Sequence, residues 1–415
     1  MLFGILLRKV IKDGYLVVYD ADGTRHEYGN ASAPDKVTIR LHAKALHWKL
    51  AVNPRLYIGE AYMDGTLTVE DGGSIYDLVA LLVRNTAYER VGSLDRANFQ
   101  VRRILRSFAQ ANPAARSKRN VAHHYDLSDA LYALFLDKNR QYSCGYFADP
   151  SMSLEQAQLA KLDHISKKLM AGPEHRVLDI GCGWGGLAMH IAETTGAQVT
   201  GITLSEEQHA YATAKARERG LADRVTFHLR DYRNETGTYD RIVSVGMFEH
   251  VGVPNYDAYF ECIRDRLSQR GIAMMHTIVQ AHLPWPTNPW LMKYIFPGGY
   301  CPAVSEVLRS IEKLGLWTTD MESWRLHYAE TLRHWRDAFL ARRDEAAALY
   351  DEKFCRMWEF YFVGCEVGFR HDSLMVMQFQ LARERDAVPL TRNYLYPAST
   401  AQSDEPASYP PRQVA

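Results

Sequence analysis

The chain has 415 residues, 47% of them apolar, and its 49 basic and 49 acidic residues cancel. This length is sufficient for two domains of the usual size. The balanced charge argues against a dedicated nucleic-acid-binding protein, which usually presents a strongly basic face, so we expect no nucleic-acid partner.

Six cysteines are scattered along the chain, with no CxxC pair and no histidine at zinc-finger spacing. We therefore expect no disulfide framework, no metal site and a reducing, cytoplasmic location. The opening "MLFGILLRKVIKDG" has an apolar run that is too short for a signal-peptide core, and no small-residue cleavage site follows it. No window offers the roughly 18 apolar residues of a membrane span, so a soluble or peripheral protein is expected.

Residues 1–95 are predicted to form a small mixed α+β domain. Two short β runs flank Asp22-Gly23 in "YLVVYDADGTRHEYG", which is a strong hairpin signal. The stretch "KVTIRLH" alternates like a further strand. In "SIYDLVALLVR", Ile75, Leu78 and Leu82 recur at helical spacing, which predicts a helix.

Residues 96–119 are predicted to be a basic linker. The part "VRRILRSFAQANPAARSKR" has six basic and no acidic residues, and Ile104, Leu105 and Phe108 give it an apolar side. Two interpretations stay open: a solvated linker, or a surface that meets anionic lipid headgroups through charge and apolar insertion together. On the second interpretation, residues 102–119 and the N-terminal domain bind the surface of a phospholipid bilayer.

From residue 120 to about 390, strand and helix patterns alternate. The predicted strands are "RVLDIGCG", "AQVTGITLS", "RVTFHLRDY", "YDRIVSVGMFEHVG" and "GIAMMHTIV", and helical patterns such as "EEQHAYATAKARERG" separate them. This alternation predicts an α/β domain with a mostly parallel, Rossmann-like sheet and helices on both faces. Residues 391–415 are rich in Pro and Ser and are expected to be disordered.

A glycine-rich turn follows the first strand of this domain in "VLDIGCGWGG". Gly181 and Gly183 permit backbone conformations that other residues avoid and leave the backbone open to a ligand. Because GxGxG is not the dinucleotide-binding GxGxxG, the turn alone is weak evidence. Asp179, on the strand before the turn, can accept hydrogen bonds, and the pair Asp231-Tyr232 after the third strand can hold an adenine ring. Together these features resemble the S-adenosylmethionine (SAM) site of class I methyltransferases.

The second strand departs from that pattern. Many such enzymes end this strand with an acid that holds the ribose hydroxyls, whereas here the strand ends in "GITLSEEQ". Thr203, Ser205 and Gln208 are therefore expected to take this role. Glu206 and Glu207 are typical of a first helical turn behind a Ser205 cap.

Seven motifs then occur in one order: "AHHYDLSDALYALFLD", "QYSCGYF", "LDIGCGWGGLA", "GITLSEEQ", "MFEHVG", "MHTI" and "KYIFPGGY". Over residues 120–385 they closely resemble the cyclopropane-fatty-acyl-phospholipid synthases and the related mycolic acid cyclopropane synthases. The stretch "NPRLYIGEAYMDG" resembles the extra N-terminal domain of the bacterial phospholipid enzymes, which the mycolic acid branch lacks.

The resemblance implies a specific reaction. The SAM methyl group is transferred to a cis double bond of an acyl chain within a phospholipid, a carbocation forms, and loss of a proton to a bound bicarbonate closes the ring. The alkene and the sulfonium must be held close together, and water must be kept away from the cation. An anionic base in an apolar pocket needs charge-assisted or backbone hydrogen bonds.

The resemblance also implies which residues act. It places the bicarbonate site on Cys144, Glu249, His276, Ile278 and Tyr328. His276 and Tyr328 can donate hydrogen bonds, and Glu249 can accept the bicarbonate proton or orient His276. Glu249 is expected to end its strand at the carboxyl edge of the sheet, where open α/β sheets bind ligands. His250 is expected to be structural or supporting.

Cys365, in "YFVGCEVGF", aligns with a cysteine that is sometimes assigned as catalytic in this family. A thiol nucleophile needs an activating neighbour, and the sequence shows none. Cys365 is kept as a candidate catalytic residue.

For SAM, the resemblance and the strand-end residues together predict a binding set. The set is Tyr142, Ser143, Asp179, Gly181, Cys182, Gly183, Thr203, Leu204, Ser205, Gln208, Asp231, Tyr232 and Arg233. The faces of aromatic residues are a further hypothesis for cation stabilisation, with Tyr146, Trp184, Phe248 and Tyr294 as candidates.

Residues 290–300 resemble part of an acyl-channel lid, preceded by a proline-rich loop. Trp285 and Trp290 either face a membrane interface or pack on the core.

Three alternatives to cyclopropanation stay open. The same sites produce a methyl-branched or methylene-bearing chain if the cation loses a different proton. A small-amine methyltransferase is a second alternative, although it would need neither the N-terminal domain nor the basic segment. A catalytically inactive lipid-binding protein is the third. The family also implies a possible homodimer and a cytoplasmic enzyme associated peripherally with the inner face of the membrane.

Overall fold

The N-terminal domain is a four-stranded sheet covered by helices. A computed structural model describes residues 2–86 and 128–396, so the predicted linker at 96–119 and the end of the tail lie outside the described residues. The sheet order is β2-β1-β3-β4, built from β1 (Tyr15–Tyr19), β2 (Arg25–Gly29), β3 (Lys36–Leu41) and β4 (Leu67–Glu70). The predicted hairpin is confirmed, since β1 and β2 pair antiparallel around Asp22-Gly23. The helices are α1 (Leu2–Val10), α2 (Leu46–Val52), α3 (Pro54–Met63) and α4 (Ile75–Thr86).

The second domain contains a seven-stranded sheet with the order β10-β11-β9-β8-β5-β6-β7. Its strands are β5 (Arg176–Ile180), β6 (Gln198–Thr203), β7 (Val225–Leu229), β8 (Tyr239–Val245), β9 (Leu267–Gln280), β10 (Trp317–Trp324) and β11 (Leu374–Ala382). Strands β5 to β9 run parallel, and β11 lies antiparallel between β9 and β10. The predicted mostly parallel sheet is confirmed. The chain order reverses between β5 and β8, which is where open α/β sheets bind ligands at the carboxyl ends of the strands.

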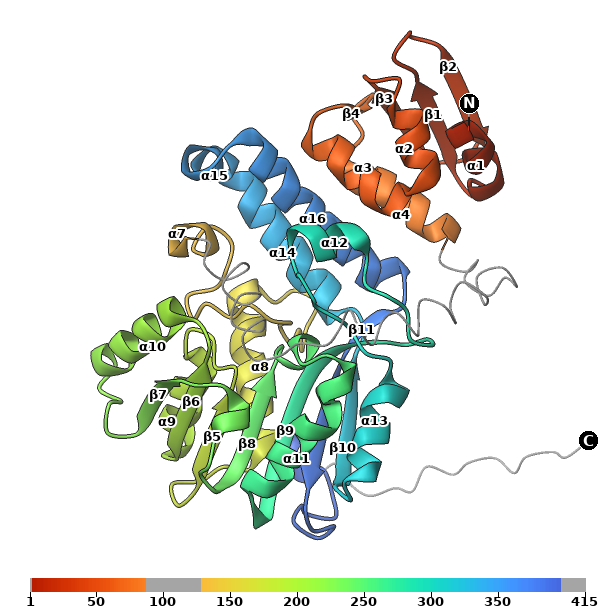
Figure 1. Ribbon diagram of the computed structural model, residues 1–415. Helices are drawn as coiled ribbons and strands as arrows, with labels where there is room; N and C mark the ends of the chain where they lie inside the picture. The colour runs from red at the N-terminus through yellow and green to blue at the C-terminus, as the bar shows by residue number, and fades with distance from the viewer. Residues whose placement is uncertain (1, 87–127, 397–415) are drawn as a thin grey trace, which may run out of the picture.

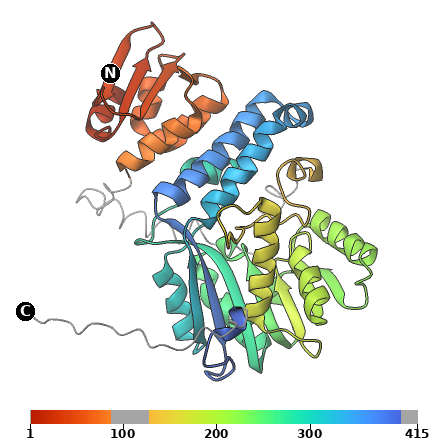
Figure 2. The ribbon, with the colours of Figure 1, turned by 180° about the vertical axis from the view of Figure 1, so that it is seen from behind.

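Helices cover both faces of this sheet (Figures 1 and 2). One face packs against α8 (Leu154–Leu169), α9 (Gly186–Thr195) and α10 (Glu206–Glu218), and the other against α11 (Tyr256–Arg266) and α13 (Val304–Lys313). Strands that are buried on both faces are apolar almost throughout. The centre of β8, Ile242-Val243, is an example. These two apolar layers hold the strand ends in fixed positions.

A helical cap lies above the carboxyl edge of the sheet (Figure 1). It consists of α7 (Asp129–Tyr132), α12 (Pro289–Tyr294), α14 (His327–Ala341), α15 (Arg343–Leu349) and α16 (Glu352–His371). The N-terminal domain packs on this cap through α3 and α4, which contact α16, and one apolar core runs through both. Within residues 2–86 and 128–396, no helix has both the length and the apolar character needed to cross a membrane.

Trp290 lies in this interface between the domain and the cap. Only 1% of it is exposed, and a Cβ added at Gly59 of α3 would come within 2.5 Å of its ring. Its Nε1 donates a hydrogen bond to Met63 Sδ at 3.3 Å. The alternative in which Trp290 is exposed at a membrane interface is therefore wrong, because glycine at position 59 lets the indole pack directly on α3.

Two boundaries differ from expectation. Strand β8 ends at Val245, and Glu249 lies beyond it in the 3-10 turn η3 (Phe248–His250), so the prediction that Glu249 ends its strand is wrong. The extended backbone stops because Gly246 has a φ of 65°, which turns the chain over the sheet edge. At the other end, η5 (Asn393–Leu395) packs against α8 with Leu395 buried, so the described fold continues past residue 390.

Candidate active site

The glycine turn after β5 has the conformation that its sequence requires. Gly181, Gly183 and Gly185 have φ values of 80°, 55° and 81°. The backbone N–H groups of Gly181 and Cys182 donate to Ile202 O, which ties the turn to β6. A Cβ at Gly183 would meet no atom within 4 Å, so this residue borders open space where a ligand can approach the backbone.

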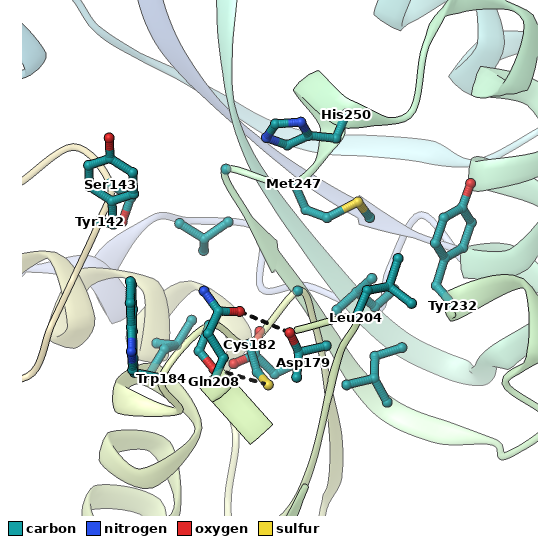
Figure 3. A pocket seen from close by; sticks show the side chains of 18 of the residues that line it. Tyr142, Ser143, Asp179, Cys182, Trp184, Leu204, Gln208, Tyr232, Met247 and His250 are labelled. Atoms are coloured by element: carbon teal, nitrogen blue, oxygen red, sulfur yellow. Dashed lines mark hydrogen bonds between the residues drawn. The ribbon is translucent and has the colours of Figure 1, made fainter. Parts of the chain in front are cut away.

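A pocket opens directly over this turn (Figure 3). Twelve of the thirteen predicted SAM-binding residues line it: Tyr142, Ser143, Asp179, Gly181, Cys182, Gly183, Thr203, Leu204, Gln208, Asp231, Tyr232 and Arg233. In Figure 3, Tyr142 and Trp184 lie on one side, Tyr232 lies on the opposite side, and His250 and Met247 lie across from Asp179. Ser205 is the exception, because its hydroxyl accepts from Gln208 N and caps α10 instead of lining the pocket.

Asp179 is the most polar group in the floor of the pocket. It is 2% exposed, and its Oδ2 has no hydrogen-bond partner among the described residues. Burial raises the pKa of this carboxyl to about 7. A buried carboxylate without a donor is unfavourable, so the residue is matched to a ligand that brings an amino or hydroxyl donor.

Thr203 and Gln208 stand beside it and are already joined, because the Thr203 hydroxyl donates to Gln208 Oε1 at 2.9 Å. Both side chains are about 5% exposed and face the pocket. Their remaining donors and acceptors can serve the ribose hydroxyls that an acid holds in other enzymes of this fold.

Asp231 and Arg233 form the far wall with Tyr232. Arg233 donates to Asp231 Oδ1 from its backbone N at 3.0 Å and from Nε at 2.9 Å. Burial alone would raise the pKa of Asp231, but these hydrogen bonds outweigh it and hold the pKa below its usual value. Asp231 is thus a paired carboxylate, unlike Asp179, and it holds Arg233, whose guanidinium lies 5.6 Å from the centroid of the Tyr232 ring.

The pocket has further residues that the sequence analysis missed as ligand-binding: Arg140, Gln141, Val245, Gly246, Met247, His250 and Val251. Burial lowers the pKa of His250 to about 4, so its ring is neutral at neutral pH. Arg140 has a φ of 51°, unusual for a residue with a side chain, and its guanidinium forms an ion pair with Asp129 at 2.8 Å. In the sequence, these residues were indicated only by their position near residues that were predicted to belong to the site.

A second group of buried polar residues lies beside this pocket and begins with Glu249. The Glu249 Oε1 accepts a hydrogen bond from the backbone N–H of Ile278 at 2.7 Å. Its Oε2 is buried and has no hydrogen-bond partner among the described residues. Burial raises the pKa of Glu249 to about 7, although the hydrogen bond from Ile278 opposes the rise. One oxygen is thus fixed and the other is left for a ligand.

Cys144 is fully buried beside a buried cation. Lys161 of α8 is 0% exposed, and its Nζ donates to Ser143 Oγ at 2.8 Å. Burial lowers the pKa of Lys161 to about 8, and burial raises the pKa of the Cys144 thiol far above its usual range. The backbone N–H of Gly145 donates to Thr331 Oγ1 at 2.9 Å, which attaches this segment to α14. The sequence analysis did not identify Lys161.

His276 lies on β9 between these residues. Its Nδ1 is 3.1 Å from Gln378 Nε2, and the edge of its ring meets Trp324 with centroids 5.1 Å apart. Burial, followed by the charges of Lys161 and Lys168, lowers the pKa of His276 well below its usual value, so the ring is neutral. A neutral imidazole can still donate one hydrogen bond.

The residues predicted for the bicarbonate site are joined only in parts by the contacts of the described residues. Ile278 and Glu249 are hydrogen-bonded, and the charge of Lys161 acts on both Cys144 and His276. Tyr328 stands one helical turn before Thr331 and packs on Phe369 with centroids 4.7 Å apart. Glu249 Oε2 is unpartnered among the described residues, Lys161 acts on Cys144 and His276, and none of these four residues lines the pocket over the glycine turn.

Cys365 and three of the four proposed aromatic residues, Tyr146, Phe248 and Tyr294, do not line the pocket over the glycine turn. Cys365 lies partly buried on α16, and burial raises the pKa of its thiol to about 12. Of the four aromatic candidates, Trp184 lines the pocket. Phe248 is stacked on Tyr256 in the core, and the Tyr294 hydroxyl donates to Glu60.

The sheet topology and the glycine-turn pocket define a class I SAM-dependent methyltransferase. The structure of the mycolic acid cyclopropane synthase CmaA1, solved with SAH and CTAB, matches with a TM-score of 0.62 and 33% identity. The match covers 66% of this chain and 99% of that chain. The part of this chain beyond that match is consistent with the additional N-terminal domain.

Sequence comparison identifies the family. A family model described as mycolic acid cyclopropane synthetase matches residues 113–379, and a domain of unknown function matches residues 3–89. The cyclopropane-fatty-acyl-phospholipid synthase of Escherichia coli K12 is 37% identical over 85% of this chain and 89% of its own length. A probable fatty acid methyltransferase of Pseudomonas putida is 39% identical over 66% of this chain and 73% of its own length. The chain belongs to the cyclopropane synthase family of SAM-dependent methyltransferases.

Proposed function

We propose that this enzyme transfers the methyl group of SAM to the cis double bond of an acyl chain in a phospholipid and closes a cyclopropane ring, releasing S-adenosylhomocysteine. The observation that carries the proposal is that two buried carboxylates at the carboxyl edge of the sheet, Asp179 and Glu249, each have one oxygen that is unpartnered among the described residues. One lies in the cofactor pocket and the other beside it, so a donor-bearing ligand is required on each side. The E. coli relative is named for this reaction.

SAM, when bound, supplies an electrophilic methyl group, and bicarbonate supplies a base. Asp179, Thr203 and Gln208 would hold the cofactor by hydrogen bonds at the strand ends. Glu249 Oε2 would exchange a hydrogen bond with the anion, while Ile278 N fixes Oε1 in place. The positive charge of Lys161 favours an anion at the same site, since a charge acts strongly where water is excluded. Buried aromatic rings such as Trp324 keep water away from the reacting chain.

A methyl-branched product is the second candidate, because the P. putida relative is named a fatty acid methyltransferase. Both products use the same pocket and differ in which proton the cation loses. A base displaced slightly from its position would change the outcome without altering any residue identified above. The small-amine alternative and the inactive alternative have no comparable observation in their favour.

The test is mass spectrometry with fragmentation of lipids after incubation of the protein with SAM and vesicles of cis-unsaturated phospholipid. A gain of one CH2 unit with the double bond lost is expected for cyclopropanation. A gain that keeps a double bond, or is reduced to a methyl branch, would assign the enzyme to the branching group. No gain in the presence of bound SAM would overturn the proposal and leave the small-amine or inactive alternative.

We further propose that the enzyme works peripherally on the inner face of the membrane, as a homodimer, with residues 102–119 contributing charge. Replacing Arg102, Arg103 and Arg106 by Gln is expected to weaken binding to anionic vesicles, most visibly at low salt. Unchanged binding would identify this segment as a plain linker. Sedimentation equilibrium of the full chain tests the dimer.

A further inference from the structure

Helices α1 and α2 of the N-terminal domain each leave one face uncovered. On α1, Phe3 and Leu7 are buried, while Ile5, Arg8 and Lys9 are exposed and follow one another at helical spacing. Ile5 is 54% exposed. An apolar side chain in this position, next to two basic ones, gives α1 an amphipathic outer face.

The outer face of α2 has the same character. Leu46 and Leu50 point into the core, whereas Trp48 is 64% exposed and Val52, one turn later, is 60% exposed. Lys49 is exposed beside them. Single exposed apolar residues are common on protein surfaces, but a mostly exposed tryptophan is not, since this side chain is on average highly buried.

The two helices contact each other. We call the six residues Ile5, Arg8, Lys9, Trp48, Lys49 and Val52 the docking face. Tryptophan and aliphatic side chains flanked by lysine and arginine are typical of helices that lie in the interface of a membrane.

The helices of the docking face are rich in basic residues. Residues 2–12 and 42–55 contain six basic residues and no Asp or Glu, and the acidic Asp20, from the turn between β1 and β2, forms an ion pair with His47 of α2. Ion pairs elsewhere in this domain join Arg40 to Glu70 and Arg84 to Asp35. In the described part of the chain, no ion pair involves the basic residues of the docking face, so their charge remains available to an anionic partner.

A contact of the N-terminal domain leads from the neighbourhood of the docking face toward the active site. Arg55, just beyond α2, places its guanidinium over the ring of Trp285, 5.4 Å from the centroid. Trp285 belongs to the loop between β9 and α12, and Leu283 of this loop is 76% exposed. Because β9 also contains His276 and Ile278, the loop leads from the outer surface to the strand of the active site.

We propose that the docking face is the surface through which the N-terminal domain, which matches a domain of unknown function, binds a bilayer that contains anionic phospholipid. The inference rests on the proposed function in that it names where the lipid substrate is approached. A second copy of this chain is a poorer occupant, because a two-fold interface would place this basic face against itself. An anionic bilayer complements both the apolar and the basic side chains.

The experiment is vesicle co-sedimentation of the full chain without SAM, using phosphatidylcholine vesicles with and without phosphatidylglycerol. A charge variant replaces Arg8, Lys9 and Lys49 by Gln, and an apolar variant replaces Trp48 and Val52 by Ser. The charge variant is expected to lose binding to anionic vesicles on the order of a hundredfold at low salt, and to match wild type at 1 M salt. The apolar variant is expected to lose about tenfold at both salt concentrations.

Two control variants make comparable changes at exposed positions of the catalytic domain. Trp317→Ser removes a tryptophan that is 51% exposed on the edge strand β10. A triple change of Lys167, Arg217 and Arg224 to Gln removes three exposed basic residues from the catalytic domain. Both controls are expected to bind vesicles like wild type. Unfolding in urea checks that all variants remain folded.

Wild-type binding by both docking-face variants would overturn the inference. A change in the oligomeric state of either variant would also overturn it, by identifying the face as an interface between copies. Failure of the proposed function is distinguishable, because binding is measured without turnover. If the docking-face variants lose vesicle binding but the wild-type enzyme modifies no lipid, the docking face is supported and the proposed reaction is wrong. If the variants bind vesicles like wild type and the wild-type enzyme modifies lipid, the proposed reaction is supported and the docking face is wrong.

Discussion

The cofactor pocket and the group around Glu249 lie side by side at the carboxyl edge of the sheet, yet the chain builds them differently. Most of the pocket comes from short runs that directly follow β5, β6 and β7. The Glu249 group takes single residues from β9, α8 and α14, and from two loops. A site made of contiguous runs is set by local turns, whereas a site made of single residues depends on how distant elements pack.

The two regions also leave their carboxylates in different states. Burial raises the pKa of both Asp179 and Glu249 to about 7. The Glu249 carboxylate is nevertheless held by Ile278 N, while burial alone accounts for the raised pKa of Asp179. The comparison indicates that Glu249 is positioned before any ligand arrives, and that Asp179 obtains its partner from the cofactor.

The substitution with the largest expected effect, Glu249→Gln, is expected to change turnover and to leave SAM binding nearly unchanged. Glu249→Gln keeps the shape of the side chain but removes the group that exchanges a proton with the anion. We expect turnover to fall by about a hundredfold or more, as for loss of a positioned acid–base group, with SAM affinity within about threefold of wild type. SAH formation on vesicles measures the first quantity, and titration calorimetry measures the second.

A fully active Glu249→Gln variant would show that the bicarbonate site has been assigned to the wrong residues. A parallel loss of SAM affinity would show that the two regions are one. Glu261→Gln, on α11, is a matched control for the change of charge and is expected to leave both quantities unchanged.

The next effect concerns Asp179 and depends on pH. Since its folded-state pKa is about 7 and its unfolded value is 3.8, the ligand-free fold loses stability as pH rises from about 4 to 7. Asp179→Asn removes this loss, so the variant is expected to exceed wild type by up to about 4 kcal/mol at pH 8 and by little at pH 4. SAM affinity is expected to fall by about tenfold or more, because a charge-assisted acceptor is lost.

Urea unfolding at the two pH values and calorimetry with SAM measure these changes. The exposed Asp223→Asn is the control, with no expected change in stability or affinity at either pH. A stability difference for Asp179→Asn that did not grow with pH would contradict the unpartnered state of this carboxylate.

Lys161 contacts residues of both regions, and its replacement is expected to have a smaller effect than the two changes above. Its Nζ bonds Ser143, which lines the pocket, and its charge acts on Cys144 and His276. Lys161→Met keeps the length of the side chain and removes the charge. We expect the bicarbonate concentration for half-maximal turnover to rise about fivefold, in line with the loss of one charged hydrogen-bond donor, while SAM affinity stays nearly constant.

Turnover in bicarbonate-depleted buffer, titrated with added bicarbonate, measures this shift. Lys167→Met, on the exposed side of the same helix, is expected to behave as wild type. An unchanged bicarbonate dependence of Lys161→Met would remove this lysine from the site.

The sequence predicted the cofactor pocket well because its residues sit at fixed offsets from strands. Asp179 precedes the glycine turn and Tyr232 follows β7, so recognising the strands was enough to place both. Ser205 was assigned to the ligand for the same reason, although its hydroxyl is used by the α10 cap. A strand end predicts where a residue lies, but not which backbone group takes its hydrogen bond.

The Glu249 group was harder to predict. Lys161 lies in a helix that looks polar along its length, with Lys167 exposed and Lys161 fully buried, and nothing in the local pattern separates the two. The positive φ of Gly246 ends β8 early and carries Glu249 over the sheet edge, which periodicity does not reveal. Where a charged side chain is buried is decided by the packing of α8 against β9, and that information is not local.

The smallest expected effect belongs to Cys365, the remaining candidate nucleophile. A nucleophilic cysteine acts as the thiolate, and burial raises the pKa of this thiol to about 12, so it is un-ionised at neutral pH. Cys365→Ala is therefore expected to keep turnover within about twofold of wild type, with a small loss of stability from the deleted sulfur. Turnover and the rate of thiol alkylation across pH 7–9 measure this. A loss comparable to that of Glu249→Gln, together with rapid alkylation at pH 7, would instead make Cys365 the reactive group and the buried carboxylate its support.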